Sequence, residues 1–417
     1  MMALWAAIAL SAALIIGPAQ AQVFADIERI AGPGGDRAEQ PSIVVLPGDR
    51  ALLSWTELSE PFDATVKTAL FDGSDWSKPV SVATGDDLFV NYADFPSAVG
   101  FADGTLAVHW LRMIGSSPYA YGVEIALSSN DGATWGEPIT PHSDDSAREH
   151  GFVSLLPDGE DGVVVMWLDG RDYDSRQPDG PTNAMQLRST TLTSGAILGD
   201  DVVLDRRTCT CCQTSAAMTD DGTVLLAYRD RTVGEVRDIS VVRRIEGRWS
   251  APVPVSGDGW EIAGCPVNGP AIDATGERVA LAWYTEAKGE PTVKLAFSDN
   301  RGASFEAPYT IDLGNPSGRV DLMLLADGSA LVSWIEITGA GETLLVCRAT
   351  AEDGCRAVQQ ITVSASGPSL GFPRMALVGE TVLMAWTEPT QSDEGRANGG
   401  TRIGVARATP REGFANQ

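Results

Sequence analysis

A short apolar run that ends in polar residues recurs along the whole chain. Its seven copies read ALLSWTE, LAVHWLR, VVVMWLD, VLLAYRD, VALAWYT, ALVSWIE and VLMAWTE. Their aromatic residues recur every 51 to 61 positions, at Trp55, Trp110, Trp167, Tyr228, Trp283, Trp334 and Trp386. A short strand and a glycine-containing turn precede each copy, and most copies are followed by an alternating strand and a hairpin. Each repeat is therefore predicted to form about four antiparallel strands.

Four-stranded repeats joined by glycine and aspartate turns predict an all-β, seven-bladed β-propeller. The seventh repeat ends with TRIGVARAT (401–409), and no fourth strand follows it. The segment VFADIERIA (23–31) is expected to complete that blade, because this pairing would close the ring and remove an exposed sheet edge. We expect the seven aromatic residues to pack between blades. The alternative is a six-bladed ring with an irregular segment, since the third repeat carries the insertion GRDYDSRQPDGPTN (170–183).

The chain begins with an uncharged apolar run that is followed by Ala19-Gln20-Ala21. Such a run before a small-residue site predicts a signal peptide at residues 1–21, and residues 22–417 are predicted to form a single propeller domain. The alternative is an N-terminal membrane anchor, although the run is short for a bilayer span. No later segment of the sequence is long and apolar enough to cross a membrane. We expect an exported monomer, periplasmic or extracellular.

The charge balance narrows the choice of partner. The chain carries 30 lysine and arginine residues against 56 aspartate and glutamate residues, a formal net charge of −26. A surface of this sign repels nucleic acid and anionic lipid. We therefore expect no nucleic-acid partner.

Two segments resemble the Asp box, S-x-D-x-G-x-x-W. SSNDGATW (128–135) is a close copy and SDNRGASF (298–305) a looser one. On these segments and the repeats, the chain resembles the sialidase-like, Asp-box β-propellers. The segments CTCCQTS (209–215) and GCPVNGP (264–270) are similar to a bacterial group of exo-α-sialidase-like proteins. The Asp boxes themselves are turn motifs, in which aspartate caps amides and glycine accepts unusual dihedral angles.

The resemblance implies a site at one end of the central channel. Sialidases of this superfamily hold a substrate carboxylate with three arginines, whose planar guanidinium groups pair with it bidentately. They use a tyrosine activated by a glutamate as nucleophile and an aspartate as acid and base. Loops that lead into the innermost strands, or leave the second strands, open on this end. The catalytic candidates are Arg319, Arg374, Arg171, Tyr284, Glu286 and Asp94. The ligand-binding candidates are His150, Asn268, Asp321 and Arg229.

One departure from the sialidase pattern leaves the activity open. In EQPSIVVLP (39–47), Gln40 stands where sialidases place the first arginine. The first hypothesis is a glycan-active protein, an exo-α-sialidase-like glycoside hydrolase or a relative, that takes a glycan or a small anionic ligand. The second hypothesis is a non-catalytic propeller with a binding or scaffold role. Neither requires a cofactor.

Six cysteines fall into two groups. Cys347 and Cys355 flank a hairpin and are expected to form a disulfide. The repeat register brings Cys265 beside Cys209, Cys211 and Cys212 at the channel mouth. These four are expected to form disulfides in an exported protein, to bind a soft metal such as copper or zinc, or to include a strained bridge between Cys211 and Cys212.

Overall fold

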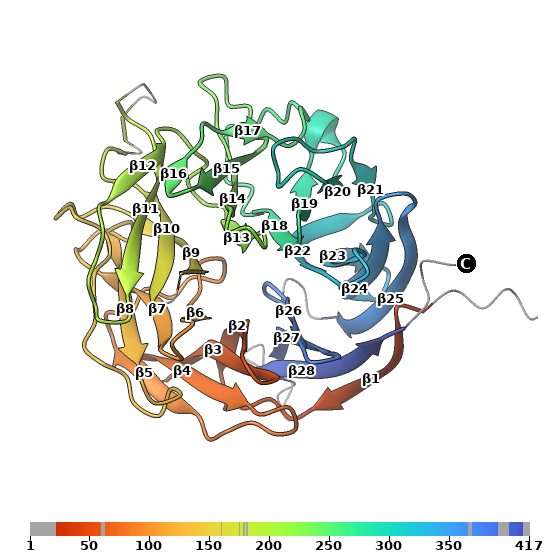
Figure 1. Ribbon diagram of the computed structural model, residues 1–417, viewed down its shortest axis with the longest axis horizontal. Helices are drawn as coiled ribbons and strands as arrows, with labels where there is room; N and C mark the ends of the chain where they lie inside the picture. The colour runs from red at the N-terminus through yellow and green to blue at the C-terminus, as the bar shows by residue number, and fades with distance from the viewer. Residues whose placement is uncertain are drawn as a thin grey trace, which may run out of the picture.

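The computed structural model shows a ring of small sheets around a central axis (Figure 1). It describes residues 22–59, 63–159, 161–174, 176–177, 180, 182–365, 369–390 and 400–411. In this part of the chain the strands form seven sheets, so the seven-bladed ring is confirmed and the six-bladed alternative is wrong. The predicted signal peptide, residues 1–21, lies outside the described residues. Within those residues, no helix has the length and apolar character needed to cross a bilayer.

The strands of each blade follow one another from the axis outward. The innermost strands are β2 (Ala38–Leu46), β6 (Ser97–Gly100), β9 (His150–Asp158), β13 (Ser215–Met218), β18 (Ala271–Thr275), β22 (Pro316–Leu324) and β26 (Arg374–Val378). The second strands are β3 (Arg50–Leu58), β7 (Leu106–Met113), β10 (Gly162–Asp169), β14 (Val224–Arg229), β19 (Arg278–Thr285), β23 (Ala330–Thr338) and β27 (Thr381–Pro389). The third strands are β4 (Ala64–Phe71), β8 (Tyr121–Ser128), β11 (Gln186–Thr193), β15 (Ile239–Ile245), β20 (Thr292–Ser298), β24 (Gly341–Thr350) and β28 (Thr401–Pro410). The outer strands are β5 (Val80–Gly85), β12 (Val202–Asp205), β16 (Arg248–Trp249), β17 (Val253–Pro254), β21 (Tyr309–Thr310), β25 (Gly354–Ser364) and β1 (Phe24–Ile30).

The second blade lacks a full outer strand. After β8, only a single bridge, between Ile125 and Ile139, occupies that place. Pro138 and Pro141 lie on either side of Ile139, and proline has no amide hydrogen to donate to a ladder. The fourth strand that we expected in this repeat is therefore reduced to one residue pair.

The N-terminal strand closes the ring, as predicted. β1 pairs antiparallel with β28, with Ile30 opposite Val405 and Glu28 opposite Arg407, so the two ends of the described chain share one blade (Figure 1). Phe24 is 0 % exposed and packs in the cluster that joins the sixth and seventh blades. Closure therefore combines a backbone ladder with a buried side chain.

The recurring aromatic residues form the contacts between blades. All seven are at most 2 % exposed. Trp334 of the sixth blade packs with Leu295 and Phe297 of the fifth, and Trp55 of the first blade packs with Val405 of the seventh. The same relation to the preceding blade holds for the remaining members, Trp110, Trp167, Tyr228, Trp283 and Trp386. The prediction that this column packs between blades is confirmed.

The acidic residue two positions after several of these tryptophans accepts a hydrogen bond from the buried indole. In a strand, residues two positions apart lie on the same face, and a buried indole N–H needs an acceptor. The indole nitrogens donate to these carboxylates at 2.7–3.0 Å in the pairs Trp55–Glu57, Trp167–Asp169 and Trp334–Glu336. These acids are therefore engaged with the blade interior.

The two Asp-box-like hairpins share one pattern of hydrogen bonds. The Ser128 hydroxyl accepts a hydrogen bond from the Gly132 amide at 3.0 Å, and the Ser298 hydroxyl accepts one from the Gly302 amide at 3.0 Å. Both glycines have positive φ, 74° and 68°, which glycine adopts without steric cost. The hairpins are thus turn structures that follow the third strands β8 and β20.

Candidate functional site

The innermost strands surround a central cavity of about 460 Å³. At the end where these strands begin, its lining includes Asp94, Phe95, Phe152, Gln213 and Arg374. We call this end the channel mouth. It combines two acidic or amide groups, two aromatic rings and one cation, whereas the rest of the lining is mainly aliphatic and hydroxyl side chains.

Five residues from three blades form an arginine–aromatic cluster at the mouth: Tyr92, Phe95, Arg319, Phe372 and Arg374. The ring centroids of Phe95 and Phe372 are 5.8 Å apart, and those of Tyr92 and Phe372 are 6.4 Å apart. The Arg319 guanidinium lies 5.5 Å from the Phe372 ring, and that of Arg374 lies 5.0 Å from the Phe95 ring. Tyr92 is 57 % exposed, so the cluster presents both a solvent-facing aromatic ring and two cations.

Each of the two arginines is held in place by one carboxylate, and Arg319 also by a backbone carbonyl. Arg374 donates to Asp321 at 3.2 Å, and its side chain is 21 % exposed. Arg319 donates to the Gly371 carbonyl at 3.1 Å and lies 3.5 Å from a Glu342 oxygen. A guanidinium has five N–H donors, so each arginine keeps donors beyond these contacts. The structure therefore brings the predicted Arg319, Arg374 and Asp321 together.

Asp94 is a buried acid on the same cavity wall. It is 4 % exposed, and its Oδ1 accepts a hydrogen bond from the Phe152 amide at 2.8 Å. Its Oδ2 has no hydrogen-bond partner among the described residues. Burial, together with the nearby charge of Glu149, raises the pKa of Asp94 to about 8. At neutral pH this side chain is mainly a neutral acid that can donate a proton.

Phe95 and Phe372 were missed in the sequence prediction, although a local signal marks both. Each stands directly before a proline that leads into an innermost strand, in FPS (95–97) and FPR (372–374). The same position is filled by Gln40 in the first blade and Arg319 in the sixth. Aligning the repeats at this position would have placed both rings at the mouth.

Arg229 and Asn268 connect loops rather than facing the cavity. Arg229 is 2 % exposed and donates to the carbonyls of Asn268 at 2.8 and 3.0 Å and of Tyr284 at 2.7 Å. The Asn268 side-chain oxygen accepts a hydrogen bond from the Arg319 amide at 2.7 Å. These residues therefore join the fourth, fifth and sixth blades and orient the backbone of Arg319.

Tyr284 and Glu286 do not have the geometry of an activated nucleophile. Tyr284 is 8 % exposed and packs edge-on against Trp260, whereas Glu286 is exposed. Burial and the charge of Glu286 raise the pKa of Tyr284 to about 12. A higher pKa leaves less phenolate at neutral pH, which is the opposite of what a nucleophile needs.

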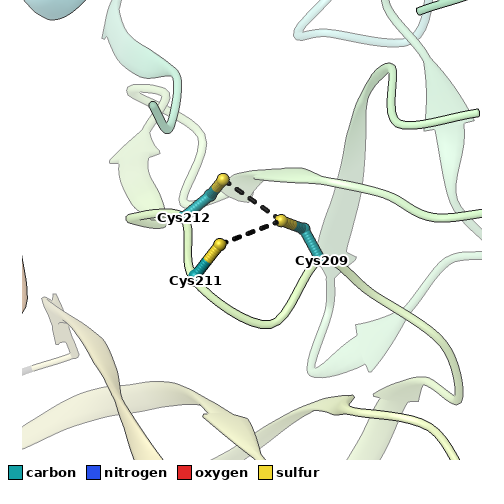
Figure 2. A group of neighbouring side chains, drawn as sticks. All are labelled: Cys209, Cys211 and Cys212. Carbon is teal, nitrogen blue, oxygen red and sulfur yellow. Dashed lines mark hydrogen bonds between the residues drawn. The ribbon is translucent and has the colours of Figure 1, made fainter. Parts of the chain in front are cut away.

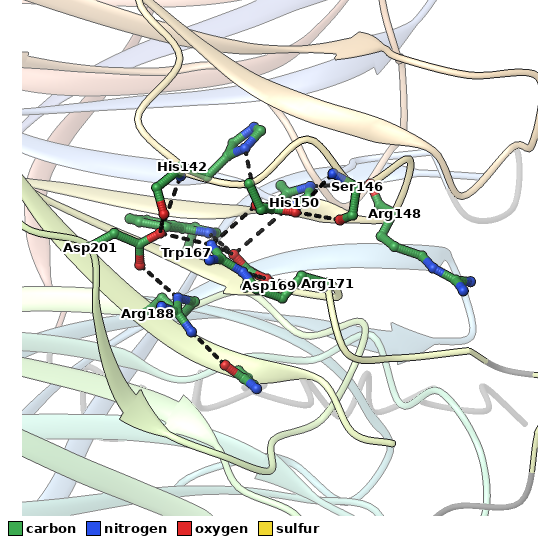
Figure 3. Close-up of polar contacts among 12 residues, drawn as sticks. His142, Ser146, Arg148, His150, Trp167, Asp169, Arg171, Arg188 and Asp201 are labelled. Atoms are coloured by element: carbon green, nitrogen blue, oxygen red, sulfur yellow. Dashed lines mark hydrogen bonds and ion pairs between the residues drawn. The ribbon is translucent and has the colours of Figure 1, made fainter. Parts of the chain in front are cut away.

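His150 and Arg171 belong to a buried ion-pair network in the third blade (Figure 3). His150 is 0 % exposed, and its Nε2 lies 3.0 Å from Asp144 and 3.7 Å from Asp169. Arg171 pairs with Asp169 at 2.7 Å and with Asp201 at 2.8 Å. Both predicted site residues are thus committed to carboxylates of their own blade, and neither belongs to the arginine–aromatic cluster.

His142 completes this network by stacking on His150. The ring centroids are 4.0 Å apart and the planes are 12° from parallel. A metal ion is bound in the plane of an imidazole ring, so two rings stacked in this way cannot both direct a nitrogen at one ion. Arg171 also lies 3.2 Å from the Asp144 oxygen that both histidines face. The arrangement is therefore a salt-bridge network in which the Arg171 guanidinium supplies the cation.

The network predicts a pH-dependent contribution to stability. Burial alone would disfavour the imidazolium, but the hydrogen bond to Asp144 and the charges of Asp169 and Asp144 raise the pKa of His150. A raised pKa means that the protonated imidazole stabilises the folded state. This contribution is fully present at pH values below the pKa of the unfolded state, about 6.5. It is lost as the pH rises through the pKa of the folded state. We expect His150→Gln to lower the free energy of unfolding by about 1–3 kcal/mol at pH 6, and by less at pH 9.

Urea unfolding of both proteins at the two pH values measures this difference. His109→Gln is the matched control, because burial lowers the pKa of His109 to about 3. Its cost is expected to be larger at pH 9 than at pH 6, the opposite trend. A cost at His150 that does not change with pH would mean that its imidazole is neutral in the folded protein.

Three cysteine sulfurs converge in the loop before β13 (Figure 2). The Sγ of Cys209 lies 3.8 Å from that of Cys211 and 3.2 Å from that of Cys212. Cys209 and Cys212 are 0 % and 2 % exposed. Burial alone would raise the pKa of Cys209, but the neighbouring thiols and the Arg237 guanidinium, 3.5 Å away, hold it well below the usual range. Arg237, which the sequence prediction missed, thus offsets negative charge on the sulfurs.

The fourth cysteine of the group lies at the solvent edge. Cys265 is exposed, and its Sγ lies 3.9 Å from the Thr210 hydroxyl. Hydrogen bonding from Cys211 lowers the pKa of Cys265 to about 7. No disulfide joins any of these four cysteines in the structure. Elsewhere, Cys347 and Cys355 form a disulfide, with a Cα–Cα distance of 5.9 Å.

No protein-family model matches the chain, and no curated protein matches it. Among solved structures, the polysaccharide lyase Uly1 superposes with a TM-score of 0.54 at 7 % identity, over 89 % of this chain and 90 % of that one. A protein of unknown function from Dyadobacter fermentans DSM 18053 gives 0.50 at 15 % identity, over 93 % and 99 %. The NanB sialidase of Streptococcus pneumoniae gives 0.47 at 13 % identity, over 93 % and 71 %.

At these identities the first two similarities establish the fold. Both cover most of either chain, which agrees with a ring of blades and not with a local match. Fold and site together define the chain as a seven-bladed β-propeller with an arginine–aromatic cluster at its channel mouth.

Proposed function

We propose that this protein is an exported, sialidase-like propeller that binds an anionic glycan at the channel mouth. The observation that carries the proposal is the arginine–aromatic cluster, in which Arg319 and Arg374 lie over the rings of Phe372 and Phe95. Aromatic faces pack against apolar ring surfaces of a ligand, and guanidinium forks pair with carboxylates or sulfates. A sugar acid presents both kinds of surface at once.

The electrostatics of the chain favour selectivity for such a ligand at this place. The chain as a whole carries a charge of −26, so a single acidic sugar gains little from the surface at large. The two arginines supply local positive charge, while the Tyr92 ring is open to solvent. Affinity is therefore expected to depend on direct contacts with the cluster, and to fall with added salt.

Asp94 supports a second step, cleavage of a glycosidic bond. A general acid must be protonated at working pH and must face the leaving oxygen. The pKa of Asp94, about 8, meets the first requirement, and Asp94 belongs to the cavity lining beside Phe95. Uly1, which has the same fold, is a polysaccharide lyase. We include hydrolysis in the proposal: Asp94 gives its proton to the leaving oxygen as the glycosidic bond breaks, and water forms the new bond to the sugar and returns a proton to Asp94.

Calorimetric titration with sialyllactose, and with lactose as its neutral match, tests the binding proposal. We expect saturable binding of sialyllactose and none of lactose, because only the former carries a carboxylate. Oligomers of glucuronate and galacturonate extend the series to uronic acids. Failure of every acidic glycan to bind would contradict the proposed function.

Turnover is measured separately with a fluorogenic sialoside, and by mass spectrometry of the oligomers after incubation. Asp94→Asn is expected to remove turnover while leaving binding within about threefold, since a neutral amide replaces an acid that is mainly neutral at pH 7. Binding without any turnover would favour the non-catalytic alternative, a propeller with a binding role.

A further inference from the structure

The sulfur cluster before β13 is a second site, which the glycan proposal does not use. Its three sulfurs, from Cys209, Cys211 and Cys212, all lie within 4.8 Å of one another. Thiolates that share one metal ion at about 2.3 Å are themselves separated by about 4 Å. We propose that these three cysteines bind one soft, thiophilic d¹⁰ metal ion, and that copper(I) is the ion they select.

The donor set decides the class of metal. The three grouped donor atoms are all sulfur, and soft sulfur ligands select copper(I) or zinc(II) over magnesium, calcium or manganese. Structural zinc is almost always four-coordinate. The fourth cysteine, Cys265, hydrogen-bonds with Cys211 at the exposed edge, whereas the sulfurs that all lie within 4.8 Å of one another number three. Three sulfurs around one ion suit copper(I), which is stable in trigonal coordination.

The loop that carries the sulfurs is held rigidly from several sides. The Cys209 amide donates to the Arg229 carbonyl at 3.0 Å. The Gln213 side chain donates to the Ala93 carbonyl at 2.6 Å and accepts from the Gly269 amide at 3.0 Å. A Cβ on Gly269 would lie 2.1 Å from the Gln213 carbonyl oxygen. Such packing fixes ligands before the metal arrives, which raises affinity.

The charge around the site and the exposure of its cysteines indicate the side from which a metal ion enters. Three thiolates around a monovalent ion leave a net negative charge, which the Arg237 guanidinium at 3.5 Å from the Cys209 sulfur partly compensates. Exposure increases from buried Cys209 and Cys212, through the partly exposed Cys211, to the exposed Cys265. Cys265 is therefore placed to receive the ion from solvent and pass it to Cys211 by ligand exchange.

The test uses the whole protein, purified anaerobically with its thiols reduced. Copper(I) is titrated in competition with bicinchoninate, and zinc(II) is titrated separately against a chromophoric chelator. We expect one copper(I) per chain, a sulfur-to-copper charge-transfer band in the ultraviolet, and an X-ray absorption spectrum that fits three sulfurs. Loss of a residue that only hydrogen-bonds to a metal ligand already lowers metal affinity by about 10–100-fold. Cys211→Ser removes a ligand itself, so it is expected to weaken copper binding by about 100-fold or more.

Two further variants separate the roles of the other cysteines. Cys265→Ser is expected to keep the stoichiometry and the three-sulfur spectrum, and to slow copper transfer to and from the chelator. The double variant Cys347→Ser/Cys355→Ser removes two sulfurs elsewhere and is expected to bind copper as the wild type does. Thermal melts of each apo variant show whether it is folded, and the spectrum of the wild type counts sulfurs without relying on any variant.

Three results would overturn the proposal. In the first, protein with four reduced thiols retains no copper against the chelator. In the second, zinc binds to four sulfurs and excludes copper. In the third, a disulfide within the cluster persists under mild reductant. None of these outcomes depends on a glycan, so the metal site and the proposed function fail or hold independently.

Discussion

Replacing Phe24 by alanine is expected to lower the free energy of unfolding by about 3–5 kcal/mol, the usual cost of truncating a fully buried phenylalanine. Phe24 is 0 % exposed and packs with Leu331 and Met384, which come from the second strands of the sixth and seventh blades. Its amide also donates to the side chain of Gln359 in β25 at 2.8 Å. The N-terminal strand thus completes the seventh blade and holds it against the sixth.

Phe24 lies in the strand that closes the ring. The strands of the other blades follow one another in the chain, whereas β1 and β28 pair residues that are more than 350 positions apart. Asp26→Ala, on an exposed position of the same strand, is the matched control and is expected to change stability by less than about 0.5 kcal/mol. Urea unfolding of the three proteins measures both values. Equal costs at the two positions would show that β1 is not needed to close the ring.

Removing the charge of both cluster arginines is expected to abolish measurable binding of an acidic glycan. A hydrogen bond to a charged group contributes about 1.5–3 kcal/mol, which is about 10- to 150-fold in affinity. Arg319→Gln and Arg374→Gln are each expected to weaken sialyllactose binding within that range, and the double variant by at least about 100-fold. Glutamine keeps a hydrogen-bonding side chain against the neighbouring carbonyl and carboxylate, so calorimetry reports on charge and donor geometry more than on folding.

The control for this pair is Arg248→Gln, which removes one positive charge from an exposed position on the outer strand β16. It is expected to leave the affinity unchanged within about twofold, since charges beyond about 10 Å are screened at 0.1 M salt. Wild-type affinity in the double variant would place the ligand elsewhere and would overturn the cluster as the glycan site.

The blades were predictable because their signal is local and repeated. Each copy of the heptapeptide carries its own apolar strand and its own aromatic residue, and each aromatic packs on the preceding blade by the same register. The second blade's outer strand was overpredicted. There, the two prolines around Ile139 outweighed the repeat, because proline cannot supply the amide that a ladder requires.

Contacts in the candidate site were predictable from the sequence only where two residues occupy the same repeat position on neighbouring blades. Asp321 and Arg374 lie at the same level of their ladders, opposite Ser333 and Ala385. Each ladder partner immediately precedes the recurring tryptophan of its own blade. Equal register on neighbouring blades brings the two side chains together, and the repeats alone therefore indicate their pairing.

The other arginines could not be assigned in this way, because several of their partners come from distant loops. Arg171 forms ion pairs with Asp201 and Asp144. Arg229 donates hydrogen bonds to the backbone carbonyls of Asn268 and Tyr284. A guanidinium binds whichever acceptors surround it, so its sequence position does not reveal whether a donor remains for a ligand. Burial and partner geometry separate a structural arginine from a binding one.

The sequence by itself determined the all-β ring, its seven blades, the closing strand and the position of the cysteines at the start of the fourth and fifth blades. These features depend on hydrophobic period, turn residues and repeat spacing, all of which are local. The tertiary structure alone decided that Arg319 and Arg374 lie over Phe372 and Phe95, and that three sulfurs converge beside Arg237. These contacts depend on side-chain directions across different blades, which are fixed only when the ring is closed and packed.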